Sequence, residues 1–189
     1  PRLVQFDHDA ADLEAARQAA RKVSRTARSV SATTGAAAGL GGALSMSADI
    51  PATIAIALRA IRDTGRAYGY TGDGPAEKLF RLQILELAAV DEPEARRDRI
   101  AALEAALGPA GELVHADHEH IAPIVDQAVE RISRAIAFTS FRSRAGMVVP
   151  LVGSIVGGLV NSSFQEDVGK AARFAFQARR LKGDASAAA

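Results

Sequence analysis

The densest group of side chains able to do chemistry lies in the segment 112–120, where histidines alternate with carboxylates. On a helix, Glu112, His115 and Glu119 would share one face with His118 beside them, and such a face can hold a divalent metal ion. The segment contains only half of a di-metal carboxylate motif, because a second Glu-x-x-His and two partner glutamates are missing. We therefore predict that the segment is a solvated connection between helices and not a metal site. In the alternative, a metal site, these four side chains would be the ligands.

Other patterns typical of catalytic or cofactor sites are missing from the sequence. The glycine-rich run 35–42 lacks the Gly-Lys-Ser/Thr ending of a phosphate-binding loop, and no strand precedes it. Ser154 follows a glycine but lacks the second glycine of a nucleophile elbow. The chain has no cysteine, which excludes thiolate metal ligands and a cysteine nucleophile. We predict no catalytic residue and no cofactor.

A basic stripe is the clearest charge pattern. Arg17, Arg21, Arg25 and Arg28 recur at helical spacing, and such a stripe suits an anionic membrane surface. The alternative is an ordinary solvated helix face, since Glu14 lies nearby. The formal net charge of +1 gives no concentrated basic field, so we expect no binding to nucleic acid.

Two stretches without any charged residue, 29–48 and 145–165, have the length of a bilayer span, about twenty residues. The first is rich in Ser, Thr and Gly and is too polar to insert alone, so it is either a loop or a helix stabilised by packing. The most apolar part of the second, 147–160, is too short to cross and contains Pro150. We therefore expect the second stretch to be a buried partner in a helical hairpin. A membrane-surface insertion and a transmembrane segment are the alternatives.

The elements that position these residues are all expected to be helices, because no stretch alternates with a period of two. Asp49 is expected to cap the N-terminus of a helix that ends at Gly69, and Gly183 to begin a frayed end. The other predicted helices cover residues 9–30, 75–90, 93–107, 124–142 and 164–182. The predicted fold class is all-α: a compact multi-helix bundle of about six to eight helices with a Gly/Ala-rich central hairpin. One domain covers 1–183, and 184–189 form a flexible tail.

The apolar pattern assigns a buried face to each predicted helix. In the helix 75–90 apolar residues cover most of the circumference, which predicts a central buried helix. In the helix after Asp49, Asp63 falls on the polar side. The apolar side of that helix consists of Ile50, Ile54, Leu58, Ile61 and Tyr68.

Two blocks of the sequence resemble a known family. The stretch Ala48-Asp49-Ile50-Pro51, followed by a helix that ends in Tyr68-Gly69-Tyr70, looks like the central signature of the EcsC family. The run 150–161, continued to Leu181, is similar to its C-terminal block, and the resemblance covers roughly 32–182. The family takes its name from a bacterial operon that encodes an ABC transporter. The resemblance therefore implies an accessory or membrane-associated protein, and it supplies no catalytic residues.

Three polar residues match the family pattern, and structural roles are expected for them. Asp49 is the predicted helix cap. Asn161 either bonds a neighbouring backbone across a helix contact or ends the apolar helix. Arg180 is expected to pair with Asp49 or Asp167 across the bundle.

The leading functional hypothesis is a non-enzymatic protein that binds membrane lipid or a membrane partner, at the inner face of the cell membrane or in the cytoplasm. The acidic start of the sequence predicts no secretory signal. Homo-oligomerisation through the small-residue strips is compatible with the sequence. The alternative is a soluble apolar-ligand carrier or enzyme with a pocket lined by Ile54, Val148, Leu151 and Ile155. The residues expected to contact lipid or a partner are Arg17, Arg21, Arg25, Arg28, Leu151, Ile155 and Leu159.

Overall fold

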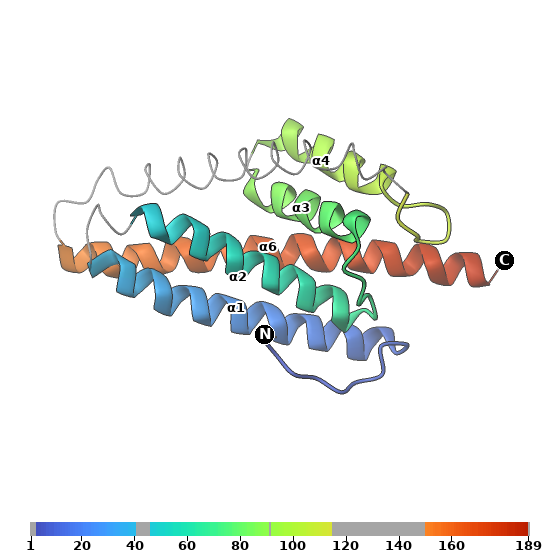
Figure 1. Ribbon diagram of the computed structural model, residues 1–189, viewed down its shortest axis with the longest axis horizontal. Helices are drawn as coiled ribbons and strands as arrows, with labels where there is room; N and C mark the ends of the chain where they lie inside the picture. The colour runs from blue at the N-terminus through green and yellow to red at the C-terminus, as the bar shows by residue number, and fades with distance from the viewer. Residues whose placement is uncertain (1–2, 41–45, 91, 115–149, 189) are drawn as a thin grey trace.

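Five helices make up the described part of the chain (Figure 1). The computed structural model describes residues 3–40, 46–90, 92–114 and 150–188, with the side chains of 3–33, 52–90, 92–114 and 163–188. The helices are α1 (Leu13–Leu40), α2 (Met46–Ala67), α3 (Pro75–Ala89), α4 (Pro93–Ala105) and α6 (Pro150–Ala187). Within these residues the only β pairing is an isolated bridge between Leu107 and Leu113. The all-α prediction is confirmed.

The number of helices in the described residues is lower than the six to eight predicted. One reason is that the apolar segment after Pro150 and the predicted helix 164–182 form the single continuous helix α6. The predicted helix 124–142 lies outside the described residues.

Helix α6 is the common partner of the other elements. It packs against α1, α2 and α3, most extensively against α1, while α4 packs on α3. In Figure 1 α6 runs along the length of the molecule, with α1 on one side of it, α3 and α4 on the other, and α2 crossing in front of it. Arg28 meets Glu166 and Arg17 meets Gln177, so α1 and α6 are antiparallel.

Small residues let these helices approach one another closely. The buried face of α1 consists of Ala16, Ala19, Ala20, Val23 and Ala27. On α6, a Cβ added at Gly169 would lie 2.6 Å from the Ser24 hydroxyl oxygen of α1. Real Cβ atoms do not approach so closely, so the α1–α6 contact requires glycine at this position.

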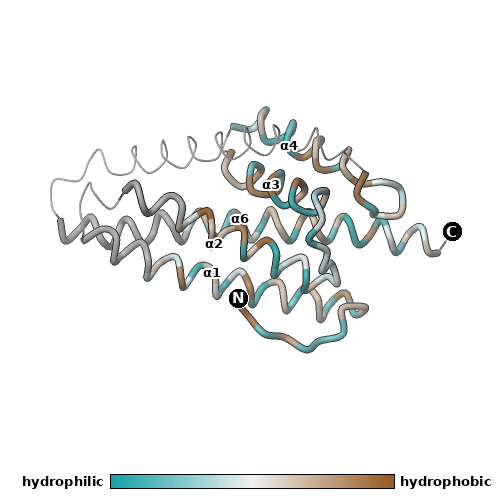
Figure 2. The backbone as a smooth tube through the Cα atoms, viewed as in Figure 1, coloured by the Kyte–Doolittle hydropathy of each residue, from teal (hydrophilic) through white to brown (hydrophobic). Residues whose placement is uncertain are grey.

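Aromatic rings fill the space between α2, α3 and α6. The Phe176 ring of α6 is fully buried and lies against Gly65, where an added Cβ would come within 2.8 Å of it. The rings of Tyr70 and Phe80 flank it, with centroids at 5.9 and 5.6 Å. Most of α3 is buried, as the sequence predicted. Figure 2 shows that hydrophobic and hydrophilic residues alternate along α2 and α3.

Several helix boundaries differ from the predictions. Helix α2 begins at Met46, so Asp49 lies inside its first turn and is not the residue that caps it. Pro51 lies in the second turn of α2, beyond the first-turn position that proline prefers, so it does not mark the start of this helix. The opposite end of α2 is as predicted, because Gly69 has a φ of 91° and stops the helix.

The two Gly-rich stretches are helical where the structure describes them. Helix α1 continues to Leu40, so residues 35–40 are helix rather than loop. Helix α6 begins at Pro150, where the missing N–H costs nothing, and runs through Asn161 and past Gly183. Of the two alternatives for Asn161, the one in which it ends the apolar helix is therefore wrong, and so is the predicted helix end before Gly183.

The polar side of α2 is also different from the prediction. Asp63 is 2% exposed, because the segment before α1 folds over it. Its carboxylate accepts hydrogen bonds from the Leu3 backbone N–H at 2.6 Å and from Arg66 at 2.9 Å. Pairing with these two donors compensates the burial of the charge.

None of the helices in the described residues is both long enough and apolar enough to span a bilayer.

Candidate functional site

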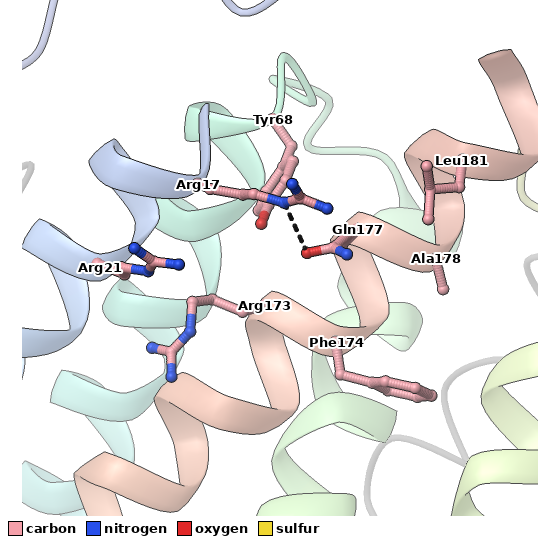
Figure 3. Close-up of a pocket in the computed structure, with 8 residues that line it drawn as sticks. All are labelled: Arg17, Arg21, Tyr68, Arg173, Phe174, Gln177, Ala178 and Leu181. Atoms are coloured by element: carbon pink, nitrogen blue, oxygen red, sulfur yellow. Dashed lines mark hydrogen bonds between the residues drawn. The ribbon is translucent and has the colours of Figure 1, made fainter. Parts of the chain in front are cut away.

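A cleft of about 500 Å³ opens where the first part of α1 and the C-terminal half of α6 lie over the end of α2 (Figure 3). Its volume falls within the range of small-molecule sites, about 300–1,000 Å³. The lining consists of Arg17, Arg21, Tyr68, Arg173, Phe174, Gln177, Ala178 and Leu181.

Three arginines give one end of the cleft its charge. Arg17 comes from α1 and donates from Nε to the Gln177 amide oxygen at 3.3 Å, and its guanidinium lies 3.6 Å from exposed Glu14. Arg173 comes from α6 and donates to the Ser24 hydroxyl at 2.5 Å. Arg21 is exposed and pairs with no side chain among the described residues. Because the lining contains no carboxylate, this end of the cleft is cationic.

Burial acts on the Arg173 guanidinium. It lowers the pKa of Arg173, and the nearby charge of Arg21 acts in the same direction. Arginine remains protonated at neutral pH, so the consequence is a charge with incomplete hydration. Such a charge gains more from an anionic partner than a fully solvated one.

Tyr68 lies at the inner side of this cationic end. The residue is 1% exposed, and its hydroxyl has no hydrogen-bond partner among the described residues. Burial raises the pKa of Tyr68, while the charges of Arg17, Arg173 and Arg21 oppose that rise. In Figure 3 the hydroxyl oxygen lies toward the arginines rather than toward the core. The hydroxyl is therefore a neutral donor at physiological pH.

The other end of the cleft is apolar and open. Phe174 and Leu181 are 45% and 46% exposed, and Ala178 lies between them on α6. The cleft therefore combines a cationic end with an apolar end, as a site for an amphiphilic anion would.

The basic stripe that the sequence singled out is divided by the structure. Arg17 and Arg21 line the cleft. Arg25 is exposed farther along α1, and Arg28 pairs with Glu166 of α6 at 3.0 Å. The four arginines thus follow the edge where α1 meets α6.

Arg180 does not pair with Asp167, one of the two partners predicted for it, and the side chain of the other, Asp49, lies outside the description. Its guanidinium pairs with Asp184 at 2.8 Å and donates to the backbone oxygens of Ala10 and Ala11. Asp167 pairs with Lys170 instead. The physical reason is the antiparallel register, which places Arg180 beside the start of α1.

Except for Glu112, the other predicted site residues lie where the structure describes only the backbone, or lie outside the described residues. Asp49 is a residue of α2, and Asn161, Leu151, Ile155 and Leu159 are residues of α6, with side chains outside the description. His115, His118 and Glu119 lie outside the described residues. Glu112 is described, and its carboxylate accepts a hydrogen bond from the Ala110 N–H at 2.9 Å. In the described part of the chain no three potential metal ligands gather.

Sequence reasoning missed Tyr68, Arg173 and the exposed pair Phe174 and Leu181 as members of one site. Tyr68 was assigned to an apolar stripe, which its burial confirms, but its hydroxyl was not considered. A usable signal was present, because Arg173 and Gln177 are spaced by one helical turn like Arg17 and Arg21.

A second polar cluster surrounds the buried Arg179 on the other side of α6. Its guanidinium donates to the Gly111 carbonyl oxygen and to Glu77, both at 2.8 Å, and lies 4.0 Å from the centre of the Tyr70 ring. Since its donors already have partners inside the protein, we assign this cluster to stability and not to binding.

A third cluster closes the turn between α2 and α3. Asp73 pairs with Arg81 at 2.7 Å and also contacts Arg62. The hydrogen bond from Arg81 lowers the pKa of Asp73. Because the Asp73 carboxylate is paired with both arginines, we assign this cluster to the turn and not to binding.

Comparisons with known proteins give two matches. The family model described as the EcsC protein family matches residues 4–181. An uncharacterised protein of Bacillus subtilis (strain 168), YdbA, is 24% identical over 147 residues, which cover 75% of this chain and 49% of that protein. The chain thus spans about half the length of this curated relative. No solved structure gives a significant match.

Proposed function

The chain belongs to the EcsC protein family, and we propose that it is a non-enzymatic, membrane-associated accessory protein that binds anionic lipid through the edge where α1 meets α6. The observation that carries the proposal is the cleft, in which three arginines lie beside the exposed side chains of Phe174 and Leu181. The operon after which the family is named encodes an ABC transporter, and this supports a place beside such a transporter at the inner face of the cell membrane.

The physics of an anionic lipid surface favours this edge of the molecule. Each arginine near such a surface contributes about 1 kcal/mol of attraction within a Debye length. Exposed Arg21 lines the cleft with the apolar pair of α6, and exposed Arg25 lies one turn farther along α1. Aromatic and leucine side chains that enter the interfacial region add hydrophobic transfer energy to the electrostatic term.

Vesicle flotation tests the proposal. We expect the protein to float with vesicles that contain phosphatidylglycerol or phosphatidic acid and to stay at the bottom with phosphatidylcholine vesicles. The double variant R21E/R25E, and separately F174S/L181S, should lose most of the floating fraction, and added salt should weaken the wild-type interaction.

The matched control reverses the same amount of charge elsewhere. Arg96 and Arg97 are exposed on α4, which packs on α3. R96E/R97E should float like the wild type. Equal losses of flotation in R21E/R25E and R96E/R97E would show that membrane binding depends on net charge alone. No flotation with any anionic vesicle would refute the proposal.

A soluble carrier or enzyme is the second candidate, and the volume of the cleft favours it. The pocket predicted from Val148, Leu151 and Ile155 lies outside the described side chains, and Ile54 is half-buried. The two candidates differ in one measurement, since a soluble carrier would bind a dispersed amphiphile and still fail to float with vesicles.

A further inference from the structure

The unpartnered Tyr68 hydroxyl is the feature of the cleft that packing does not explain. Buried polar groups almost always have a hydrogen-bond partner, because an unsatisfied one loses its hydration without compensation. Phenylalanine would fill the same space without that penalty. A ligand that accepts a hydrogen bond from the hydroxyl would satisfy it.

The charges around the hydroxyl restrict what that ligand is. Arg17, Arg21 and Arg173 line the same cleft as Tyr68, and their charges act on its hydroxyl against that of Glu14. Arg21 has no partner among the described side chains, and the main hydrogen bond of Arg173 goes to a neutral hydroxyl. The acceptor that fits is therefore an anion with several oxygens.

The number of donors favours a phosphate monoester over a carboxylate or a phosphate diester. A monoester presents three terminal oxygens and up to about two negative charges, whereas the other two groups present two oxygens and one charge. The cleft provides three guanidinium groups and a hydroxyl. Its remaining volume extends toward Phe174 and Leu181, so the rest of the ligand is apolar.

We infer that the cleft binds the phosphate monoester group of an anionic amphiphile, with the phosphate between Arg17, Arg21 and Arg173 and the Tyr68 hydroxyl donating to it. The inference rests on the proposed function for the source of the amphiphile, a membrane lipid. The chemistry of the phosphate site itself would be the same for a soluble phosphate ester.

The amino-acid composition provides a direct probe. The chain has two tyrosines and no tryptophan, so in a Y70F variant Tyr68 is the sole source of tyrosine emission. Phe at position 70 keeps the ring that contacts Phe176 and Arg179. We expect inorganic phosphate and glycerol 3-phosphate to change this emission saturably, while acetate at equal ionic strength, with two oxygens and one charge, changes it far less.

Variants identify the donors by calorimetric titration with glycerol 3-phosphate. R21M should weaken binding about tenfold, because one charge-assisted hydrogen bond is lost, and Y68F should weaken it measurably less. Arg21 is exposed, so R21M should keep the wild-type circular dichroism and melting temperature. Y68F should keep the circular dichroism and melt no lower than the wild type, because it removes a buried hydroxyl that has no partner in the described residues. R97M is the control and should bind like the wild type.

The lipid source is tested separately by flotation with phosphatidic acid against phosphatidylglycerol at equal surface charge. Preference for phosphatidic acid that disappears in Y68F supports the inference. Flotation without that preference, or equal responses to acetate and phosphate, overturns the inference but leaves the proposed function standing. If glycerol 3-phosphate binds saturably but the protein does not float, the phosphate site is supported with a soluble ester as its ligand, and the proposed membrane association is overturned.

Discussion

Arg179 shows how a single residue can connect three elements. It belongs to α6, its ion-pair partner Glu77 belongs to α3, and its backbone partner Gly111 lies in the loop after α4. Gly111 has a φ of 73°, and an added Cβ would lie 2.3 Å from the Arg179 carbonyl oxygen. The loop can approach α6 this closely only with glycine at that position.

Removing the guanidinium of Arg179 should destabilise the protein strongly. In R179M, the half-buried Glu77 would lose its partner, and breaking a buried pair costs about 3–5 kcal/mol. Both side chains of the pair are mostly buried, 9% and 14% exposed, so solvent screening is limited. Urea unfolding should show this loss in the free energy of unfolding, and the double variant E77Q/R179M should recover part of it. A loss below 1 kcal/mol would contradict the role assigned to Arg179.

Neighbouring residues explain why sequence reasoning chose differently here. The family resemblance drew attention to Arg180, while the buried role belongs to Arg179, about 100° away around the helix. The choice depends on the register of α3 against α6, which the local sequence does not encode. For the same reason Asp63 was placed on a solvated face, although Leu3 covers it.

At the scale of helices, the sequence predicted the elements well where local signals were strong. Pro75, Pro93 and Gly69 mark boundaries that the structure confirms within two residues. Local signals failed along α1 and α6, where glycines suggested interruptions. In these helices glycine serves close packing, and tertiary contact outweighs its poor helix propensity of about 1 kcal/mol.

The contact at Gly169 gives the corresponding prediction. G169A gains helix propensity but forces Ser24 and Arg173 to move, because the new methyl group would lie 2.6 Å from the Ser24 oxygen. Overpacking of this kind costs about 1–3 kcal/mol, so we expect a lower melting temperature. The double variant S24G/G169A should restore part of the loss.

A second glycine serves as the control for that experiment. Gly74 has open space around its Cα and a φ of −65° that alanine adopts without strain. G74A should leave the melting temperature nearly unchanged. A G169A protein as stable as the wild type would show that α1 and α6 are less closely packed than described.

At the scale of the whole molecule, the cleft exists only because α1 and α6 dock. Arg17 and Arg173 are far apart in sequence, and nothing local indicates that they meet. The sequence therefore predicted a basic stripe and apolar helices correctly, but not that one stripe and one helix face would form a site together. Composition and periodicity specify elements, while the site depends on how the elements are paired.

Because α6 shares a core with α1, α2 and α3, we expect these helices to unfold together. In the Y70F variant, urea transitions followed by Tyr68 emission and by helical circular dichroism should have the same midpoint. Tyr68 reports the packing of α1, α2 and α6, whereas circular dichroism reports all helices. Separate midpoints would show that α3 and α4 form an independent unit.

The central place of α6 has a consequence for synthesis. A ribosome makes this helix after α1 to α4, yet α6 provides the surface on which three of them pack. The alanine face of α1 and the surface around Gly65 remain exposed to solvent until Phe176 and its neighbours in α6 have left the exit tunnel. Such late closure over long sequence separations slows folding and prolongs exposure of apolar surface. We therefore expect the nascent chain to be prone to association with chaperones until its last described helix is complete.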